Sequence, residues 1–360
     1  MDLERSSAMS AATKNAAHGS ADLAALAEIV ERFAGKRIAL FGDFVADEFQ
    51  YGDISRVSRE APVLILRHRE TRVVPGGGAN AANNLAALGA NVSPVTVVGE
   101  DSVGDALVKQ FRENGVDASG IIRAKNWNTP TKTRFLAGWT HTVAQQVLRV
   151  DREPGCVPSD STLAKVAAKL QSKLRTADGL AISDYGFGVA SPSAVGKAVR
   201  AGKRKLPVTL DARYSLQAYA GSGITAATPN EAELEALHHT TIGRNLTELE
   251  KRGLTTLKKM ALQSLLVTRG KDGMALFEHG RKGATLIPVH GSDQAVDVTG
   301  AGDTVLAAYT LALACGAKPF DAAHIANIAG GLVVMKRGTA VVTRGELLAA
   351  IRGEVSGSAA

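Results

Sequence analysis

Two glycines and an aspartate precede a long apolar run near the end of the chain, in DVTGAGDTVLAAYTLAL (297–313). A helix beginning here needs only one capping residue, so the remaining polar and small residues call for another reason. Gly300, Ala301 and Gly302 let consecutive backbone N–H groups turn toward one point, and the helix dipole has the same direction. Such a loop can stabilise a developing anion. Asp303 beside it then fits a general base that takes a proton from an attacking hydroxyl, which favours phosphoryl transfer.

A second glycine-rich stretch, PGGGANAANNLAALGAN, covers residues 75–91. Gly76 and Gly77 belong to a triplet that lets the backbone approach a ligand closely, and the helix start that follows offers free N–H groups. Asn80 adds an amide that suits a hydroxyl-rich ligand. A glycine loop with capping asparagines is the alternative interpretation, because a glycine triplet alone is a weak signal.

Five further polar positions come directly after predicted strands. They are Asp43 after RIALF, Asp184 after LAIS, Asp211 after PVTL, Asn230 at the end of TPN, and Arg269 after LLVT. Each of them alone is as consistent with a turn former or a helix cap as with a ligand. Ligands of open α/β sheets bind at the carboxyl ends of the strands, so the five together predict a binding site there.

Other nucleotide and nucleophile motifs do not fit the sequence. A dinucleotide fingerprint GxGxxG would need glycine where Val305 stands and should follow the first strand. A Walker A sequence GK[ST] is missing at this loop, and the chain has no GxSxG nucleophile elbow.

Strand-like and helix-like segments alternate along most of the chain. This rhythm predicts an α/β fold with a doubly wound, mostly parallel sheet flanked by helices. Two stretches differ, at about 44–74 and 130–151, because their short alternating segments indicate a small β lid. Residues 1–20 are expected to be a disordered tail, and 21–355 form one domain.

Composition limits the class of partner. Lys and Arg exceed Asp and Glu by 42 − 35 = 7, but the charges are dispersed and no aromatic residues alternate with them, which argues against nucleic acid. No secretory signal or membrane-length apolar run is present. The two cysteines lie far apart in sequence and outside any metal-ligand spacing. These features predict a cytoplasmic enzyme with a small-molecule substrate and no membrane partner.

The two glycine-rich stretches resemble the signatures of the ribokinase-like (PfkB) carbohydrate kinases. Within that family, seven further stretches resemble the kinases that phosphorylate heptose 7-phosphate at C1 in lipopolysaccharide core synthesis. They are GDFVADEFQYGDISRVSREAPV, TKTRF, QQVLRVD, ISDYG, TPNEAELE, LVTRGKDGM and IANIAGGLVVMKRGTAVV. The resemblance extends from about residue 37 to about 343. It implies a ribokinase-like sheet with a small β-sheet lid, and transfer of the γ-phosphate of ATP to a sugar hydroxyl.

On the nucleotide side, the resemblance implies that Asp303 is the catalytic base and that the GAG loop before it is the anion hole. Asn230 and Glu233 match an NxxE motif that organises Mg²⁺ and its waters. A monovalent cation is a further candidate activator. The phosphate channel and the adenine pocket are matched by Asp184, Asp211, Arg213, Arg269 and Asn327.

On the sugar side, the matching positions are Asp43, Asp47, Gly76, Gly77 and Asn80. Lys132 and Arg134 lie two apart on one predicted strand and so face the same way, as a phosphate on the substrate would require. Arg56 can approach from the other lid segment. The alternative is that these cations merely protect a strand edge.

The sequence departs from the family pattern at two basic positions. Phe187 stands where a lysine is expected after ISDY, so this position should make no phosphate contact. Arg213 replaces a frequent lysine and keeps its charge. The chain also ends soon after the kinase signatures, without the nucleotidyltransferase motif that some members carry, so we expect a separate enzyme to take the product.

Two alternatives stay open at this point. One is a kinase of the same fold acting on another sugar, sugar phosphate or nucleoside, and the other is an inactive sugar-binding module. The intact GAGD sequence disfavours the inactive module. We also expect a homodimer through the β lid, because a small sheet with Val63, Ile65 and Leu66 is poorly suited to stand alone in water.

Overall fold

The computed structural model describes residues 21–138, 144–202, 204–291 and 295–353. The expected tail at 1–20, a turn expected around Trp139 and the residues after 353 lie outside this part of the chain.

A nine-stranded sheet forms the centre of the molecule, in the order β13-β12-β11-β10-β9-β8-β1-β4-β5. Neighbouring strands are parallel from β5 to β11, and β12 and β13 are antiparallel. The predicted doubly wound, mostly parallel sheet is therefore confirmed. The strands are β1 (Arg37–Gly42), β4 (Asn91–Gly99), β5 (Ile121–Ala124), β8 (Gly179–Asp184), β9 (Val208–Ala212), β10 (Ala226–Ala227), β11 (Ser264–Thr268), β12 (Met274–Glu278) and β13 (Thr285–Ile287).

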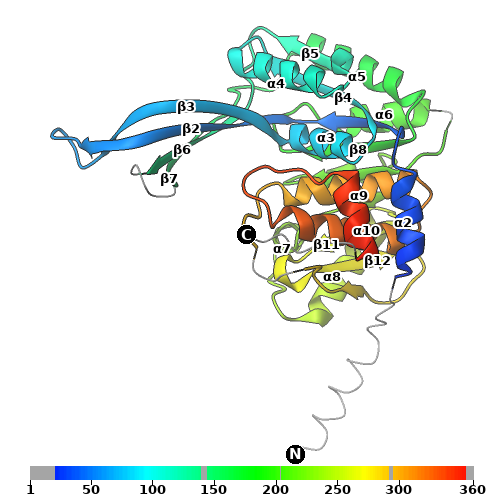
Figure 1. Ribbon diagram of the computed structural model, residues 1–360. Helices are drawn as coiled ribbons and strands as arrows, with labels where there is room; N and C mark the ends of the chain where they lie inside the picture. Colours follow the sequence, from blue (N-terminus) through cyan, green and yellow to red (C-terminus); the bar gives the residue numbers. More distant parts are fainter. Residues whose placement is uncertain (1–20, 139–143, 203, 292–294, 354–360) are drawn as a thin grey trace, which may run out of the picture.

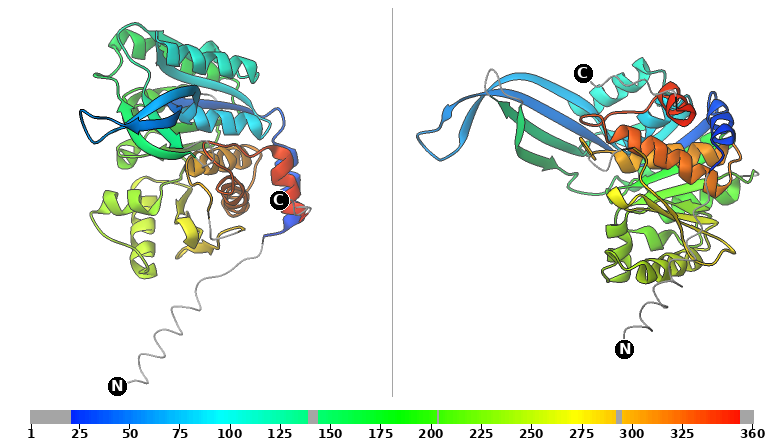
Figure 2. Two further views of the ribbon diagram at one scale, coloured as in Figure 1. Left: turned by 60° about the vertical axis from the view of Figure 1, so that its left-hand side comes forward. Right: turned by 60° about the horizontal axis from the view of Figure 1, so that its bottom comes forward.

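Helices cover both faces of this sheet (Figures 1 and 2). The hydrophobic core accordingly forms two clusters, one on each face. The first face carries α2 (Leu23–Glu31), α3 (Gly78–Ala87), α4 (Ser102–Glu113), α9 (Ala301–Ala314), α10 (Pro319–Val333) and α11 (Arg344–Arg352). The second carries α5 (Asp160–Leu174), α6 (Pro192–Ala201), α7 (Glu231–His238) and α8 (Leu246–Lys259). Short 3₁₀ turns are η1 (Ala118–Gly120), η2 (Leu216–Tyr219) and η3 (Gly270–Asp272).

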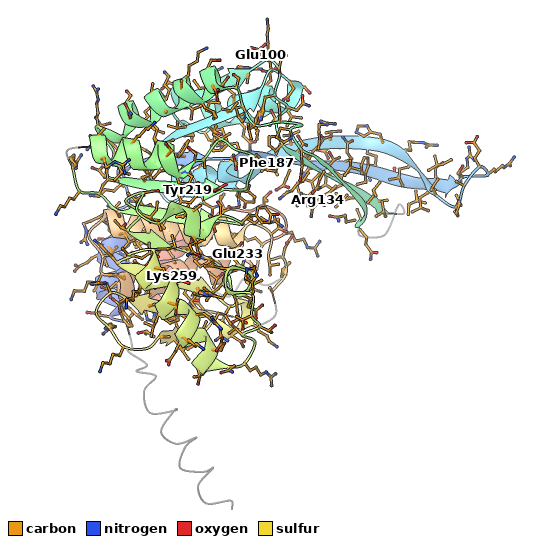
Figure 3. The ribbon with its side chains drawn as sticks, turned by 180° about the vertical axis from the view of Figure 1, so that it is seen from behind. Glu100, Arg134, Phe187, Tyr219, Glu233 and Lys259 are labelled. Carbon is orange, nitrogen blue, oxygen red and sulfur yellow. The ribbon has the colours of Figure 1, made fainter. Side chains whose placement is uncertain are left out.

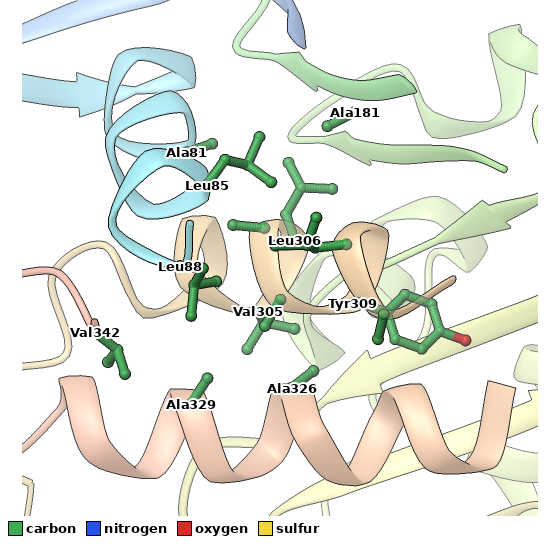
Figure 4. Packing of buried hydrophobic residues seen from close by; sticks show 14 of the residues in the cluster. Ala81, Leu85, Leu88, Ala181, Val305, Leu306, Tyr309, Ala326, Ala329 and Val342 are labelled. Carbon is green, nitrogen blue, oxygen red and sulfur yellow. The ribbon is translucent and has the colours of Figure 1, made fainter. Parts of the chain in front are cut away.

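Helix α9 lies inside the molecule, between α3 and α10 (Figure 4). Ten of its residues in an unbroken run, from Asp303 to Ala312, are buried. A helix that is apolar on all sides needs such an environment. Its small side chains allow close packing. The Tyr309 hydroxyl donates a hydrogen bond to the Ser264 hydroxyl at 2.8 Å. The start of α9, which carries Asp303, is thus held by the core.

A separate four-stranded sheet, in the order β3-β2-β6-β7, confirms the smaller sheet expected from the sequence. Its strands are β2 (Phe44–Val57), β3 (Leu64–Gly77), β6 (Thr131–Gly138) and β7 (Gln145–Arg152). The β2–β3 pair forms a long ribbon that extends away from the body (Figures 1 and 2). Strand β2 begins just after β1, and β3 runs directly into α3. The base of this sheet therefore adjoins the carboxyl ends of the main strands.

Candidate active site

Asp303 is a buried carboxylate at the first turn of α9. One oxygen accepts a hydrogen bond from the Asn80 amide at 2.9 Å, and the other accepts one from the Tyr185 hydroxyl at 3.2 Å. Burial raises the pKa of Asp303 to about 7, and these two hydrogen bonds oppose the rise. The group is thus poised to exchange a proton near neutral pH.

A chain of hydrogen bonds fixes the orientation of the Asn80 amide. The Thr304 hydroxyl donates to Asn84 Oδ1 at 2.9 Å, and Asn84 Nδ2 donates to Asn80 Oδ1 at 3.2 Å. Asn80 Oδ1 is therefore an acceptor in this chain, and its Nδ2 must be the atom that faces Asp303. All three partners are fully buried, and they connect α3 with α9.

Gly300 makes this contact possible. Its φ of +79° is strained for other residues, and a Cβ built there would lie 2.4 Å from Asn80 Nδ2. Gly302 differs, because a Cβ there would meet nothing within 4 Å of it in the described structure. The first glycine therefore serves the protein's own packing, and the second leaves open space at the helix start.

Asp47 lies at the base of the ribbon, where it forms an ion pair with Arg134. Both side chains are mostly buried, and Arg134 also lies over the Phe49 ring, 5.4 Å from its centroid. A Cβ at Gly76 would come within 2.5 Å of the Asp47 carboxylate, so the glycine leaves room for that group. Figure 3 shows Arg134 where the ribbon joins the body. Because the Arg134 guanidinium already forms an ion pair with Asp47, the expectation that Arg134 binds a substrate phosphate is weakened.

Two of the expected ligand carboxylates accept hydrogen bonds from nearby loops. Asp43 is fully buried and accepts backbone N–H bonds from Tyr185, Phe187 and Val189 at 2.9, 3.0 and 3.0 Å. Burial raises its pKa to about 6, against these hydrogen bonds. The carboxylate shapes the loop after β8, and the sugar-binding role of Asp43 stays a prediction.

Asp184 is likewise occupied. Its oxygens accept from Gly186 N–H at 2.9 Å, the Ser215 hydroxyl at 2.6 Å and the Tyr219 hydroxyl at 2.9 Å. These partners belong to the loops after β8 and β9, so Asp184 connects the two loops. Its expected place in a phosphate channel stays a prediction.

Arg269 is also directed into the protein. It donates to Glu231 at 2.6 Å and to the Gly243 carbonyl at 3.3 Å, and only 6% of its side chain is exposed. The expected contact between Arg269 and the nucleotide is not supported by this geometry.

Asn230 and Glu233 form a capping box at the start of α7. Asn230 Oδ1 accepts from Glu233 N–H at 2.8 Å, and Glu233 Oε2 accepts from Asn230 N–H at 2.9 Å. The bonds still leave the Asn230 NH₂ group and one Glu233 oxygen without a partner in the cap. Burial raises the pKa of Glu233. Figure 3 labels this residue.

Asp211, at the end of β9, completes an acidic region around the start of α7 and α9. Burial raises its pKa well above the usual range, and the neighbouring Glu233, Asp303 and Asp184 raise it further. Repulsion of this kind is relieved by a cation. Among the described residues, no group of three or more His, Cys, Asp or Glu side chains is arranged to bind a metal directly.

Two pockets flank Asp303. The first is mainly apolar and reaches the helix start at Ala301 and Gly302, with Asn327 as a polar group in its wall. The second is polar, lies on the other side of Tyr185, and includes Lys132 and Arg213. The expected residues Gly77 and Asn80 lie at the end of β3 and in the first turn of α3.

Within one chain, Arg56 lies far from this site. It pairs with Ile65 in the outer part of the ribbon, nine residues beyond Asp47, which is about 30 Å along a strand. The side chain is exposed there.

Sequence reasoning missed the roles of several residues as partners of the site. Tyr185, Asn84 and Thr304 support Asp303 and its amide partner, directly or through the chain described above. Their positions beside recognised motifs were a signal, but the side-chain pairing depends on the packing of α3 against α9.

The fold and the arrangement of the site define a carbohydrate kinase. Residues 36–344 match the pfkB family of carbohydrate kinases, and the chain belongs to this family. In the described residues no helix is both long and apolar enough to cross a membrane.

Curated relatives include two proteins called bifunctional protein HldE. That of Trichlorobacter lovleyi is 36% identical over 325 residues, covering 90% of this chain and 64% of the relative. That of a Caulobacter species is 38% identical over 339 residues, covering 91% of this chain and 65% of the relative. The chain thus spans a little less than two thirds of the length of these relatives.

Solved structures show the same fold at low sequence identity. Ribokinase of Arabidopsis thaliana, complexed with ribose and ATP, has a TM-score of 0.67 at 21% identity and covers 89% of this chain and 99% of its own. Phosphofructokinase-2 of Escherichia coli, with substrates and products, has a TM-score of 0.70 at 18% identity, with 88% and 99% covered. The expected ribokinase-like fold is confirmed.

Proposed function

We propose that this protein is an ATP-dependent kinase of D-glycero-D-manno-heptose 7-phosphate. It phosphorylates the anomeric C1 hydroxyl to give the 1,7-bisphosphate, a step toward ADP-heptose and the lipopolysaccharide core. The observation that carries the proposal is the buried Asp303 between an apolar and a cationic pocket. Similarity to the HldE proteins and the motifs shared with heptose 7-phosphate kinases support the sugar class.

Asp303 accepts the proton of the attacking sugar hydroxyl. Its raised pKa favours this transfer near neutral pH. Asn80 and Tyr185 hold the two carboxylate oxygens in place. The free N–H groups at the start of α9 stabilise the negative charge that develops on the transferred group.

The first pocket fits an adenosine group. Its wall is formed largely by aliphatic side chains, including Val289, Val298 and Val305, as a flat base requires. Asn327 Nδ2 donates to the Pro288 carbonyl at 2.8 Å, which leaves the amide oxygen as an acceptor. ATP, when bound, supplies the phosphoryl group.

Mg²⁺ would be held near Asn230, Glu233 and Asp211. The acidic region described above suits a cation, and contact through water is compatible with the lack of a direct metal-binding group of carboxylates among the described residues. Activation by a monovalent cation stays a prediction. Since ATP is a cytoplasmic substrate, we place the reaction in the cytoplasm.

A coupled assay of ADP release over a panel of acceptors tests the proposal. The panel contains heptose 7-phosphate, unphosphorylated heptose, fructose 6-phosphate, ribose and a nucleoside. We expect kcat/KM to be highest for heptose 7-phosphate. A clear preference for any other acceptor would move the assignment to another kinase of this fold.

A further inference from the structure

The second pocket gathers cations from two parts of the fold. Strands β6 and β7 of the small sheet contribute Lys132 and Arg149, and the loop after β9 contributes Arg213. The register places Lys132 opposite Asp151 and Arg134 opposite Arg149, so these side chains share one face of the sheet. That face is turned toward the loop of Tyr185 and Phe187.

The charges in this pocket are only partly balanced. Arg149 is fixed by Asp151 through two hydrogen bonds of 2.7 and 2.5 Å, and Glu153 is the other acidic residue in the wall. Among the described carboxylates, none forms an ion pair with Lys132 or Arg213. Burial and the nearby positive charges of Arg213 and Arg149 lower the pKa of Lys132, although Asp47 and Asp151 oppose this. An anion in the pocket would relieve the unfavourable proximity of three cations.

The position of Lys132 relates the pocket to the catalytic carboxylate. Its ammonium group lies 5.4 Å from the centre of the Tyr185 ring, and the hydroxyl of the same ring donates to Asp303. The cation and the proposed base are therefore separated by one tyrosine side chain. A sugar whose reacting hydroxyl meets Asp303 can extend past this ring, with its far end among the cations.

Phe187 explains why the cations come from other elements. Its backbone N–H is held by Asp43, and its side chain lines the same pocket while packing against the core cluster that includes α5 and α6. The position that departs from the family lysine thus gives an apolar wall. The positive charge is supplied by the small sheet and by the loop after β9.

We propose that this pocket binds a phosphate group carried by the acceptor sugar, with Lys132, Arg149 and Arg213 as its cationic ligands. The inference rests on the proposed function, because it names the part of the site that reads a phosphorylated acceptor. It keeps Lys132 from the expected pair of Lys132 and Arg134, and it takes Arg149 and Arg213 in place of Arg134 and Arg56.

Steady-state kinetics of Lys132→Met and Arg213→Gln test the assignment. We expect the KM for the sugar phosphate to rise by about 10- to 100-fold, as for the loss of a charged hydrogen bond, while the KM for ATP changes little. Arg152→Gln is the matched control, because Arg152 pairs with Thr131 and points to the opposite face of β7. Thermal unfolding checks that each variant folds. A rise in the KM for ATP alone would assign the pocket to the nucleotide and overturn the inference.

A labelling experiment gives a readout that does not depend on turnover. Cys156 is exposed and lines the pocket, whereas Cys315 is far from it, on α9's C-terminal side, and serves as an internal reference. With ADP present, inorganic phosphate or heptose 7-phosphate should slow alkylation of Cys156 but not of Cys315, measured by peptide mass spectrometry. Lys132→Met and Arg213→Gln should abolish the protection.

The two experiments separate the two proposals. If heptose 7-phosphate is not the preferred acceptor but phosphate still protects Cys156, the function fails and the anion pocket stands. If heptose 7-phosphate is turned over and neither anion protects Cys156, the function stands and this inference is wrong.

Discussion

Asp303 has a buried carboxylate whose two hydrogen-bond partners are neutral groups. Replacing it with asparagine keeps the size of the side chain but removes its ability to take a proton. We expect Asp303→Asn to lower kcat by about 10²- to 10⁴-fold, the usual share of general-base catalysis, with little change in ATP affinity. Kinetics and nucleotide titration measure both quantities. Turnover within a few-fold of the wild type would remove Asp303 from this role.

The raised pKa of Asp303 also has a consequence for stability. Since the folded protein binds this proton more tightly than the unfolded chain does, the contribution is fully present below about pH 4 and is lost as the pH rises through about 7. Asp303→Asn should therefore unfold at a higher temperature than the wild type above pH 7, with the difference shrinking toward pH 4. Asp272→Asn removes an exposed carboxylate and is the control. An equal gain at every pH would contradict the expectation.

Activity should have the opposite dependence on pH. A general base must be deprotonated, so kcat/KM should rise as the pH increases through about 7 and then level off. A pH–rate profile of the wild type measures this. If kcat/KM were constant from pH 5.5 to about 8, the ionisation of Asp303 would not control the reaction rate.

Single residues were predictable from the sequence where the chemistry is local. The glycine loop and Asp303 lie together at a helix start because they are neighbours in the chain. The partners of Asp43 and Asp184 could not be foreseen, since they come from loops after β8 and β9 that only the sheet order brings together. The Arg134–Asp47 pair depends on the register between β2 and β6 in the same way.

At the scale of elements, the two glycines at the start of α9 have different roles. Gly300→Ala should cost about 1–3 kcal/mol of folding free energy, because it combines a strained φ with a clash against Asn80. Gly302→Ala should change stability by less than about 0.5 kcal/mol, since its Cβ has space, but it should impair nucleotide binding because Gly302 lines the apolar pocket. Denaturant unfolding and ATP titration test the pair. Equal destabilisation by both changes would contradict this division.

The capping box of α7 allows a test of the expected Mg²⁺ role. Glu233→Gln keeps an oxygen that can accept the Asn230 N–H, so the helix should retain its stability within about 0.5 kcal/mol. The loss of charge should raise the Mg²⁺ concentration needed for half-maximal activity. Unchanged Mg²⁺ dependence would leave Glu233 with a structural role alone. Glu235→Gln, on the same helix, is the control for charge.

The strands of the main sheet and the helices between them could be predicted from the sequence, because each element has one buried face or a continuous buried run. The ribbon was less readable. Two strands of 14 residues each appeared as short, broken segments, because their outer parts pack against no core and register shifts interrupt the pairing near Gly52 and Arg56. Without one buried face, hydrophobic period gives little information about strand length.

At the scale of the whole molecule, the small sheet exposes an apolar surface. Val63, Leu64, Val147 and Leu148 are each more than 40% exposed, and they line a shallow pocket with Leu66 and Phe135. The expected homodimer would cover this surface, so Leu148→Glu should yield a monomer by light scattering at micromolar concentration. Leu246→Glu alters a leucine on α8 that is also more than 40% exposed, and it should leave the assembly unchanged. A monomeric wild type would contradict the expectation.

The inner ends of the two ribbon strands lie at the site, and their outer parts extend away from the body. Strand β2 leaves the body immediately after β1 and carries Asp47, and β3 returns through Gly76 into the helix that carries Asn80. A displacement of the outer end can therefore pass along both strands to Asp47 and Gly76, which lie side by side at the base of the ribbon. The ribbon is thus a continuous covalent connection between the outermost residues of the molecule and the helix that carries Asn80.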